Sequence, residues 1–263
     1  MFDALYIGAT GMQAQQLNVD TIANNLTNVN TVGFKKSRVS FADLVTGGAT
    51  GIPDGGASEA GPLAPTRRLG SGVGIARVDR MFDLGDMKQT GGALDVAIQG
   101  AGFLEVTMAD GSRAYSRGGN LKVNSEGQLV TAAGQVLKPG IQIPVNAQNV
   151  KISASGQVRV NLPGQVAPTE LGQLELVRFV SPALLQALGD GLYRTTDGSG
   201  EATTSRPGQD DAGVLVQGAV EGSNVKLVDE MISLMIAQRA YEASVKVVQA
   251  SDEMLGMVNN LRK

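Results

Sequence analysis

The chain has 263 residues, enough for one or two domains with a substantial buried core. Its 22 basic and 25 acidic residues give a formal net charge of −3, which argues against a sequence-independent nucleic-acid binder. Cysteine, histidine and tryptophan are absent, which excludes disulfides, thiol nucleophiles, imidazole bases and metal sites built from sulfur and nitrogen ligands. We therefore expect no cofactor, no metal site and no nucleic-acid partner.

The apolar runs are short, and none approaches the roughly 18 residues that a membrane helix needs. The first residues carry neither a basic leader nor an apolar stretch before a small-residue cleavage site. We therefore expect no membrane insertion, and we expect that any export proceeds without a cleaved signal peptide.

The first segment, residues 3–29, has the periodicity of one amphipathic helix. Apolar residues recur every seven positions, at Leu5, Met12, Val19 and Leu26, with Ile22 and Val29 between them in the second half. Gly33 and the basic residues after it form the stop pattern expected beyond a helix C-terminus. At ~1.5 Å per residue the helix would be about 40 Å long.

The polar face of this helix carries amides instead of ions. Up to Phe34 the only charged side chains are Asp3 and Asp20. The amides are Gln13, Gln15, Gln16, Asn18, Asn24, Asn25, Asn28 and Asn30. Amides donate and accept hydrogen bonds and are easier to desolvate than ions. The face is therefore suited to burial against copies of itself or a partner, although an ordinary helix lying on its own domain is the plain alternative.

The middle of the chain has the pattern of short strands and turns that is typical of an antiparallel β domain. Short strand-like segments, among them residues 94–98, 127–131 and 158–162, alternate with turn dipeptides. These dipeptides are Asp110-Gly111, Glu126-Gly127, Ser155-Gly156, Pro163-Gly164, Asp190-Gly191 and Asp197-Gly198. Residues 182–188 are consistent with one short helix, and the Gly/Pro-rich residues 46–65 predict an irregular connector.

The C-terminal segment repeats the helical signal over five heptads. Its seam is Leu227, Leu234, Tyr241, Val248 and Leu255, with Met231 and Val245 four residues after two of these. Ser223 and Asn224 are good N-cap residues, and Asp229 and Glu230 are acids where the helix dipole favours them. A helix of this length predicts a coiled coil or a helical assembly.

Several motifs that could carry chemistry have simpler interpretations. The glycines of residues 70–74 do not enter a helix, so turns or bulges are favoured over a phosphate loop. The basic residues 35–38 follow a helix stop, which favours a helix-end or solvated-loop role. The acid pairs Asp83/Asp86, Asp210/Asp211 and Asp252/Glu253 lack the spacing of a calcium loop. A carboxylate-based carbohydrate-active enzyme is kept as a remote alternative.

These signals divide the chain into four parts and predict an α+β fold. They are an N-terminal assembly helix (1–34), a connector (35–72), a central, mostly antiparallel β domain resembling a barrel or sandwich (73–222) and a C-terminal assembly helix (223–263). Because the two ends share a heptad repeat, we expect them to pair with each other as a coiled coil and to carry oligomerisation.

At the level of whole motifs, the sequence resembles the bacterial flagellar axial proteins, the rod and hook family. The resemblance rests on residues 10–16 (TGMQAQQ), 22–36 (IANNLTNVNTVGFKK), 94–103 (LDVAIQGAGF), 221–225 (EGSNV), 237–242 (AQRAYE) and 252–255 (DEML). Within the family, the chain length, residues 215–218 and residues 70–74 are most similar to a distal rod subunit. A proximal rod subunit, or a hook-type axial or adaptor subunit, is the alternative.

The resemblance implies a structural protein without enzymatic activity that polymerises helically into the hollow drive shaft of the flagellar basal body. It implies self-association and contact with neighbouring rod and hook subunits, surrounding ring or bushing proteins and the flagellar type III export apparatus. It also implies a location in the rod where it crosses the periplasm. The residues predicted to form the polymer interface are Leu5, Met12, Val19, Ile22, Asn24, Asn25, Leu26, Asn28, Leu227, Met231, Leu234, Gln238, Tyr241, Val248 and Leu255.

Overall fold

The computed structural model describes residues 2–46, 69–165 and 167–260. It divides into two compact units, one formed by Met1–Asn24, Arg38–Val78 and Val228–Lys263 and the other by Asn25–Ser37 and Asp79–Leu227. We call these the helical unit and the β unit. The chain passes from one unit to the other four times, so the β unit is an insertion within the helical unit.

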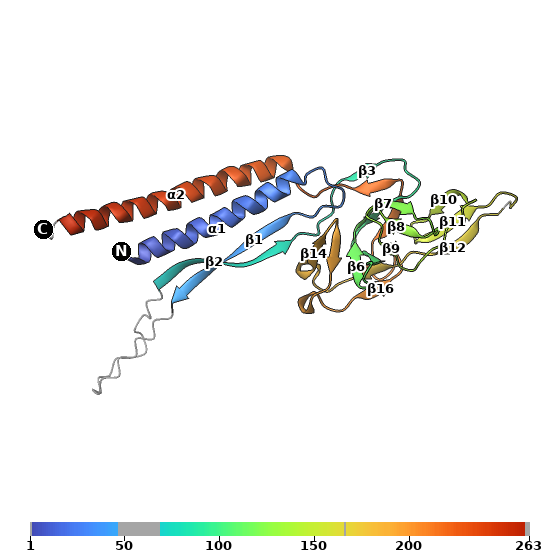
Figure 1. The fold of residues 1–263 in the computed structure, drawn as a ribbon, viewed down its shortest axis with the longest axis horizontal. Helices are drawn as coiled ribbons and strands as arrows, with labels where there is room; N and C mark the ends of the chain where they lie inside the picture. The colour runs from blue at the N-terminus through green and yellow to red at the C-terminus, as the bar shows by residue number, and fades with distance from the viewer. Residues whose placement is uncertain (1, 47–68, 166, 261–263) are drawn as a thin grey trace, which may run out of the picture. The chain divides into compact units, whose positions relative to one another are not determined.

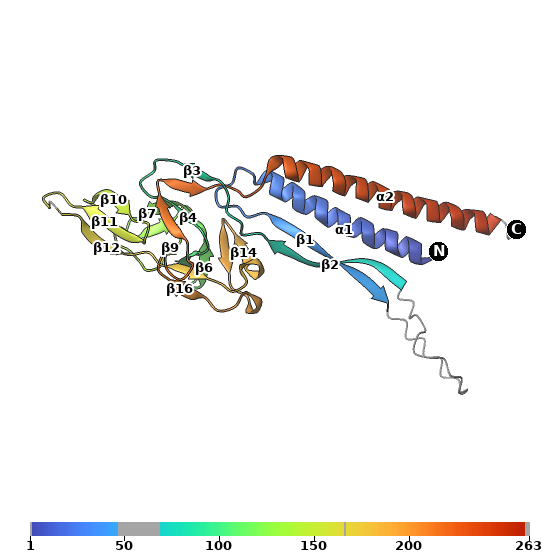
Figure 2. The ribbon, with the colours of Figure 1, turned by 180° about the vertical axis from the view of Figure 1, so that it is seen from behind.

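The helical unit confirms the two predicted terminal helices, α1 (Phe2–Thr27) and α2 (Leu227–Asn260). A two-stranded sheet formed by β1 (Ser37–Thr46) and β2 (Leu69–Arg80) completes it. Helix α1 lies between α2 and this hairpin (Figures 1 and 2). The unit therefore has three layers in the order α2, α1, hairpin.

The two helices approach each other closely at small residues. A Cβ atom added at Gly8 would lie 2.6 Å from Val248 Cγ2, and one added at Gly11 would lie 3.3 Å from Ser244 Oγ. Contacts of 2.6 Å are not possible for carbon atoms, so the absence of a side chain at Gly8 permits this approach. Ala237 of α2 is also buried. Small residues of α1 thus meet Ser244 and Val248 of α2, and of these two only Val248 belongs to the apolar seam that the sequence predicted.

The hairpin adds strands to two segments. Residues 35–72, expected to be a connector, contain β1 and the start of β2, and residues 70–74, expected to be turns or bulges, lie within β2. Gly72 has a φ of +107° and lies against Thr10, where a Cβ atom would collide with the threonine side chain. The lack of a side chain at Gly72 therefore lets β2 lie against α1. Of the predicted Gly/Pro-rich connector, residues 47–65 lie outside the described residues.

The β unit contains antiparallel strands throughout its described pairings, as predicted. Its nine-stranded sheet has the order β14 (Gln186–Gly189), β15 (Leu192–Arg194), β6 (Arg113–Ser116), β5 (Leu104–Thr107), β9 (Val136–Leu137), β8 (Leu129–Thr131), β7 (Gly118–Val123), β4 (Asp95–Gln99) and β17 (Val214–Gln217). Among the described strands, β14 and β17 are not paired with each other, so the sheet is not the closed barrel considered from the sequence.

Three smaller sheets surround it. They are β10 (Gln148–Ile152), β11 (Gln157–Asn161) and β12 (Thr169–Gln173); β13 (Leu176–Arg178) with β16 (Thr203–Ser205); and β18 (Ala219–Glu221) with β3 (Met87–Gln89). Two short 3-10 helices are Pro182–Leu184 and Asp197–Ser199. The helix expected over residues 182–188 is therefore a single 3-10 turn followed by β14.

Five of the six predicted turn dipeptides connect adjacent antiparallel strands. Their glycines, Gly111, Gly127, Gly156, Gly164 and Gly191, all have positive φ, which glycine adopts without strain. The sixth dipeptide, Asp197-Gly198, lies in a 3-10 helix instead. Turn chemistry therefore predicted the hairpins of this unit correctly.

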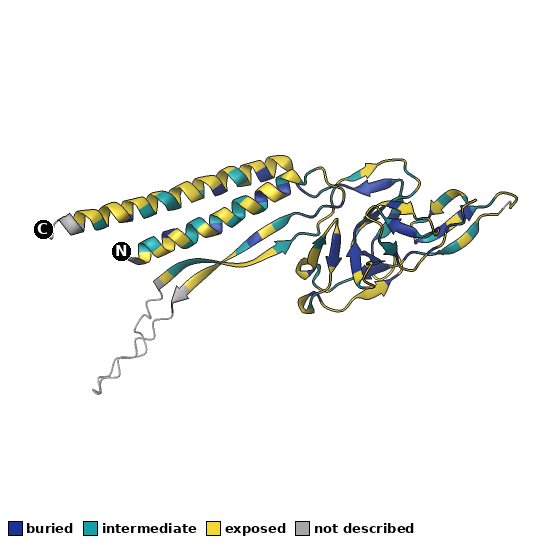
Figure 3. Cartoon of the chain, in the orientation of Figure 1, coloured by how far each residue is buried: buried dark blue, intermediate teal, exposed yellow. Residues whose placement is uncertain are grey.

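The β unit has its own core. Valines, leucines and isoleucines from its sheets form the larger cluster, and many of them, such as Val96, Ile98 and Val106, are fully buried. An aromatic cluster formed by Phe82, Phe103, Tyr115, Phe179 and Tyr193 packs edge to face, with ring centroids 4.8–5.9 Å apart. The buried residues concentrate in this unit (Figure 3).

Candidate functional site

The predicted interface residues of α1 differ in how far the chain itself covers them. Ile22 and Asn25 are buried, at 6% and 2% exposure, and Asn24 is exposed. The remaining five, Leu5, Met12, Val19, Leu26 and Asn28, are half-buried. The Asn25 amide exchanges two hydrogen bonds of 2.9 Å with the backbone of Ser37. Asn25 therefore has a role inside the chain, and the heptad residues keep part of their surface available.

The predicted interface residues of α2 are more accessible. Leu227, Met231, Gln238 and Tyr241 are exposed, and Leu234, Val248 and Leu255 are half-buried. The buried positions of the described part of α2 are Glu230, Ala237 and Ser251, which share one heptad register with Ser244. The in-chain contact thus uses Val248 of the predicted seam together with Ser244 of the neighbouring row, and the role of the seam in a polymer stays a prediction.

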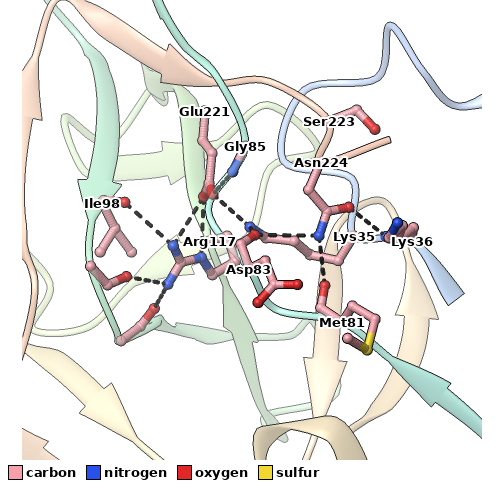
Figure 4. Close-up of polar contacts among 12 residues, drawn as sticks. Lys35, Lys36, Met81, Asp83, Gly85, Ile98, Arg117, Glu221, Ser223 and Asn224 are labelled. Atoms are coloured by element: carbon pink, nitrogen blue, oxygen red, sulfur yellow. Dashed lines mark hydrogen bonds and ion pairs between the residues drawn. The ribbon is translucent and has the colours of Figure 1, made fainter. Parts of the chain in front are cut away.

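Where the chain passes between units, the β unit contains a buried ion-pair network around Glu221 (Figure 4). Lys35 Nζ lies 2.5 Å from Glu221 Oε1, and Arg117 Nη2 lies 3.1 Å from Oε2. The Gly85 N–H also donates to Oε1, at 3.0 Å. All three side chains are at most 3% exposed. The single Glu221 carboxylate is therefore shared by two cations, and all three charges are shielded from water.

Backbone carbonyls complete the network. The Arg117 guanidinium donates to the carbonyls of Gly100, Gly102 and Ile98, and Lys35 Nζ donates to that of Asp83 at 2.6 Å. Burial lowers the pKa of the Lys35 ammonium, and the Glu221 carboxylate opposes this shift. Removing one partner from such a network leaves an uncompensated buried charge, which is strongly destabilising. The network therefore fixes the positions of its segments.

Two asparagines connect the segments that lead to the helical unit. Asn224 Oδ1 accepts from the Lys36 N–H, and Asn224 Nδ2 donates to the Met81 carbonyl, both at 2.8 Å. Asn25 joins the end of α1 to Ser37 at the start of β1. The end of α1, the start of β1, the end of β2 and the lead into α2 are thus linked inside the β unit. We call this set of contacts the junction.

The junction corrects two expectations from the sequence. Lys35 was expected in a helix-end or solvated-loop role, but it is fully buried. Asn224 was expected to cap the C-terminal helix, but α2 begins at Leu227 and the Asn224 amide instead joins two other segments. Local sequence carried no signal for either role, because the partners of Lys35 are 48 and 186 residues away and those of Asn224 are 143 and 188 residues away.

The acid pairs have not been brought together into a reactive site. The Asp83 carbonyl belongs to the junction, while Asp210 and Asp211 both have positive φ, 49° and 56°, in one tight turn. Among the described residues no group of three or more acidic side chains could hold a metal ion. Neither of the described helices has an apolar stretch that could cross a membrane.

Three family models match separate parts of the chain. Residues 5–35 match the flagella basal body rod protein model, residues 97–160 the flagellar hook protein FlgE/F/G D1 domain, and residues 216–261 the flagellar basal body rod FlgEFG protein C-terminal model. These regions contain α1 with the start of the junction, the first part of the β unit, and β18 with α2. The chain belongs to the flagellar basal-body rod protein family.

Whole-length relatives give the position within that family. The chain is 44% identical to the flagellar basal-body rod protein FlgG of Borreliella burgdorferi, with 100% of both chains covered. It is 43% identical to FlgG of Caulobacter vibrioides (98% and 99% covered) and 34% identical to FlgF of the same organism (97% and 95% covered). The chain is a structural subunit of the distal flagellar rod, and it assembles with other rod and hook subunits.

None of these matched families or relatives is a catalytic one. The comparison thus supports the structural hypothesis over the carbohydrate-active enzyme that the acid pairs left open.

Proposed function

We infer that the chain polymerises helically through its terminal helices into a hollow shaft that transmits torque and lets exported subunits pass. In this proposal α1 and α2 pair as a coiled coil and form the wall around the channel, and the chain has no enzymatic activity. The observation that carries it is the close packing of two helices from opposite ends of the chain, at Gly8 and Val248, which leaves predicted heptad residues such as Leu26 and Leu234 only half covered.

The heptad residues have the surface that a polymer requires. Half-buried apolar side chains expose part of an apolar row to water, and a second copy that covers this row recovers the free energy of burial. Because the copies of an open helical polymer meet through different faces, the contacts are heterologous and continue without closing into a ring.

The remaining parts of the proposal concern neighbours and location. We assign the β unit to the outside of the shaft, where it meets the surrounding ring or bushing proteins of the periplasm. We propose that the flagellar export apparatus delivers the chain without a cleaved signal peptide. No nucleic acid and no membrane insertion take part.

Substitutions in the heptad seam test this proposal. Leu26→Asp and Leu234→Asp each place a charge on a half-buried apolar position, so we expect either one to abolish rods and swimming. Circular dichroism of the purified variants should still report a folded β unit. The matched control, Ala243→Asp, adds the same charge at an exposed position of α2 and should still assemble. Complete rods from both leucine variants would refute the seam assignment.

The position of the subunit in purified basal bodies separates the proposal from a proximal rod or hook-type adaptor role. Labelled protein along the distal part of the rod supports the distal role. Label confined to the base of the rod, or to the hook, would contradict it.

A further inference from the structure

The exposed methionines of the described residues all lie on α2. They are Met231 (51% exposed), Met235 (58%), Met254 (44%) and Met257 (58%). The remaining described methionines are half-buried, and they are Met12, Met81, Met87 and Met108. The chain has no cysteine, tryptophan or histidine. Its methionine thioethers are therefore the side chains that a two-electron oxidant attacks first, and those of α2 are the most accessible.

Met231 and Met235 lie in a stretch of α2 without charge. Their i, i+4 spacing makes them neighbours on the helix surface, and residues 231–238 contain no charged side chain. Met254 and Met257 instead directly follow Asp252 and Glu253. Met231 is also one of the residues that the sequence predicts for the polymer interface. We call Met231 and Met235 the methionine pair.

The methionine pair lies away from the side of α2 that contacts α1. Ser244 and Val248 mark that side, and Ala237 lies buried on it. At ~100° per residue, Met235 projects roughly opposite to Ala237, and Met231 lies about 120° from it around the helix. More than half of each methionine is in contact with water. A polar atom added to either sulfur is therefore hydrated in the single chain and leaves its fold intact.

We propose that the methionine pair makes assembly sensitive to oxidation: hydrogen peroxide converts the two thioethers to sulfoxides, and the oxidised chain no longer polymerises. The inference rests on the proposed polymerisation and adds a form of regulation to it. In the reaction, a sulfur lone pair attacks one peroxide oxygen, an S–O bond forms and the O–O bond breaks. The second oxygen leaves as water, so each sulfur loses two electrons and one peroxide accepts them.

The change of polarity explains the effect on assembly. Methionine sulfoxide is polar and chiral, and its formation disrupts methionine-rich interfaces. The pair is interleaved with Ile232 and Ile236, which are 47% and 64% exposed, so a contact that covers this surface is apolar. A sulfoxide oxygen in such a contact loses its water without gaining a partner. The same contact shields the thioethers from peroxide, so oxidation acts on the chain before it assembles.

Peptide mapping measures where oxidation occurs. Trypsin separates the methionine pair in residues 227–239 from Met254 and Met257 in 247–262 and from the half-buried Met81 and Met87 in 81–88. In dilute protein treated with hydrogen peroxide, mass spectrometry should find that peptide 227–239 gains two oxygens before 81–88 does. In polymer, 227–239 should react no faster than 81–88. Equal reactivity of 227–239 in dilute protein and in polymer would refute the shielding.

Paired leucine substitutions test the effect on assembly. Leucine nearly conserves the volume of methionine and has no sulfur to oxidise. Peroxide should raise the critical concentration for polymerisation of the natural protein about 10- to 100-fold. It should leave that of Met231→Leu with Met235→Leu within about twofold. The matched control, Met254→Leu with Met257→Leu, should stay as sensitive as the natural protein. Equal sensitivity of the two double variants would overturn the proposal.

Enzymatic reduction checks that the block is the sulfoxide itself. Two methionine sulfoxide reductases, one for each epimer, should restore polymerisation of the oxidised natural protein. Dithiothreitol alone should not, because the chain has no disulfide to reduce. Thermal unfolding of the oxidised dilute protein checks that the fold is kept. A block that persists after both oxygens have been removed from peptide 227–239 would contradict the proposal.

The untreated protein distinguishes the two proposals. If it does not polymerise at any concentration, the proposed function and this inference both fail. If it polymerises, and fully oxidised protein does so at the same concentration, only the role of the methionine pair is refuted and the heptad seam stands.

Discussion

The two units of the chain differ in how far they bury their apolar side chains. In the β unit, valines, leucines and isoleucines such as Val106 and Leu129 are fully buried in a core made by that unit alone. In the helical unit, Val228 and Ile236 of α2 remain 66% and 64% exposed. The β unit is thus complete as a single chain. The helical unit leaves apolar side chains in water, and we propose that assembly covers them.

Amide hydrogen exchange of dilute protein measures this difference most directly. Amides of β4 and β5, paired on both sides within the sheet, should exchange at least about a thousandfold more slowly than those of α1 and α2, since regions with few buried contacts open locally at low free energy. In the polymer the helices should become protected. Equal protection of helices and sheet in the dilute monomer would contradict the comparison.

The junction should be the most sensitive point of the β unit. Glu221→Gln leaves Lys35 and Arg117 buried without their anion, so we expect unfolding to become easier by about 3–5 kcal/mol. Urea unfolding followed by near-ultraviolet dichroism of the tyrosines measures it. Glu170→Gln is the control, because its pair with Arg159 is about half exposed and should contribute less than ~1 kcal/mol. Equal shifts from both variants would disprove a special role for Glu221.

A single type of substitution at two helix glycines sharpens the comparison within the helical unit. Alanine normally stabilises a helix interior relative to glycine by about 0.5–1 kcal/mol. Gly256→Ala should show this gain, because nothing lies within 4 Å of its added Cβ atom. Gly8→Ala should instead lose about 1–2 kcal/mol, because Val248 must move. Thermal loss of the helical dichroism signal distinguishes the signs, and a gain at both sites would argue against the close helix contact.

The smallest effect concerns alkaline pH. Burial raises the pKa of the Tyr193 hydroxyl above its usual value of 10.0. The stability that the neutral group contributes is complete below about pH 10 and is lost as the pH rises through the folded pKa. Tyr193→Phe should therefore lose less stability than the natural protein as the pH rises above about 10. The lowered pKa of Lys35 acts with the opposite sign but is common to both proteins. Identical pH dependence of their urea midpoints would refute the assignment.

The sequence predicted those elements whose signal is local. Apolar residues seven apart, such as Leu227 and Leu234, indicated helices that the structure confirms, and dipeptides such as Asp110-Gly111 indicated hairpins because glycine favours the backbone angles of their turns. The helix contact at Gly8 and Ser244 could not be predicted, because a search for apolar periodicity looks for large apolar side chains. Gly8 and Ser244 matter because their side chains are small enough to let the helices approach.

The junction was missed for a different reason. Lys35 follows a helix and has two basic neighbours, a pattern that is usually solvated, and its partner Glu221 is 186 residues away. Only the fold reveals that both are buried. The hairpin was missed because glycines at positions 70, 72 and 74 weaken a strand pattern, although at Gly72 the lack of a side chain makes room for α1.

The insertion of the β unit within the helical unit also governs the order of folding. Gly8 and Val248 are 240 residues apart in sequence, and closing a loop of that length in an unfolded chain costs about 5 kcal/mol by the logarithmic relation for flexible loops. Once the β unit has folded, the junction has already brought the ends of α1 and the beginning of α2 into one small region, and most of that entropy has been lost beforehand. The helix pair can then close quickly. A chain that ends before α2 has the segments of the β unit but no partner for α1, so its helical unit stays incomplete.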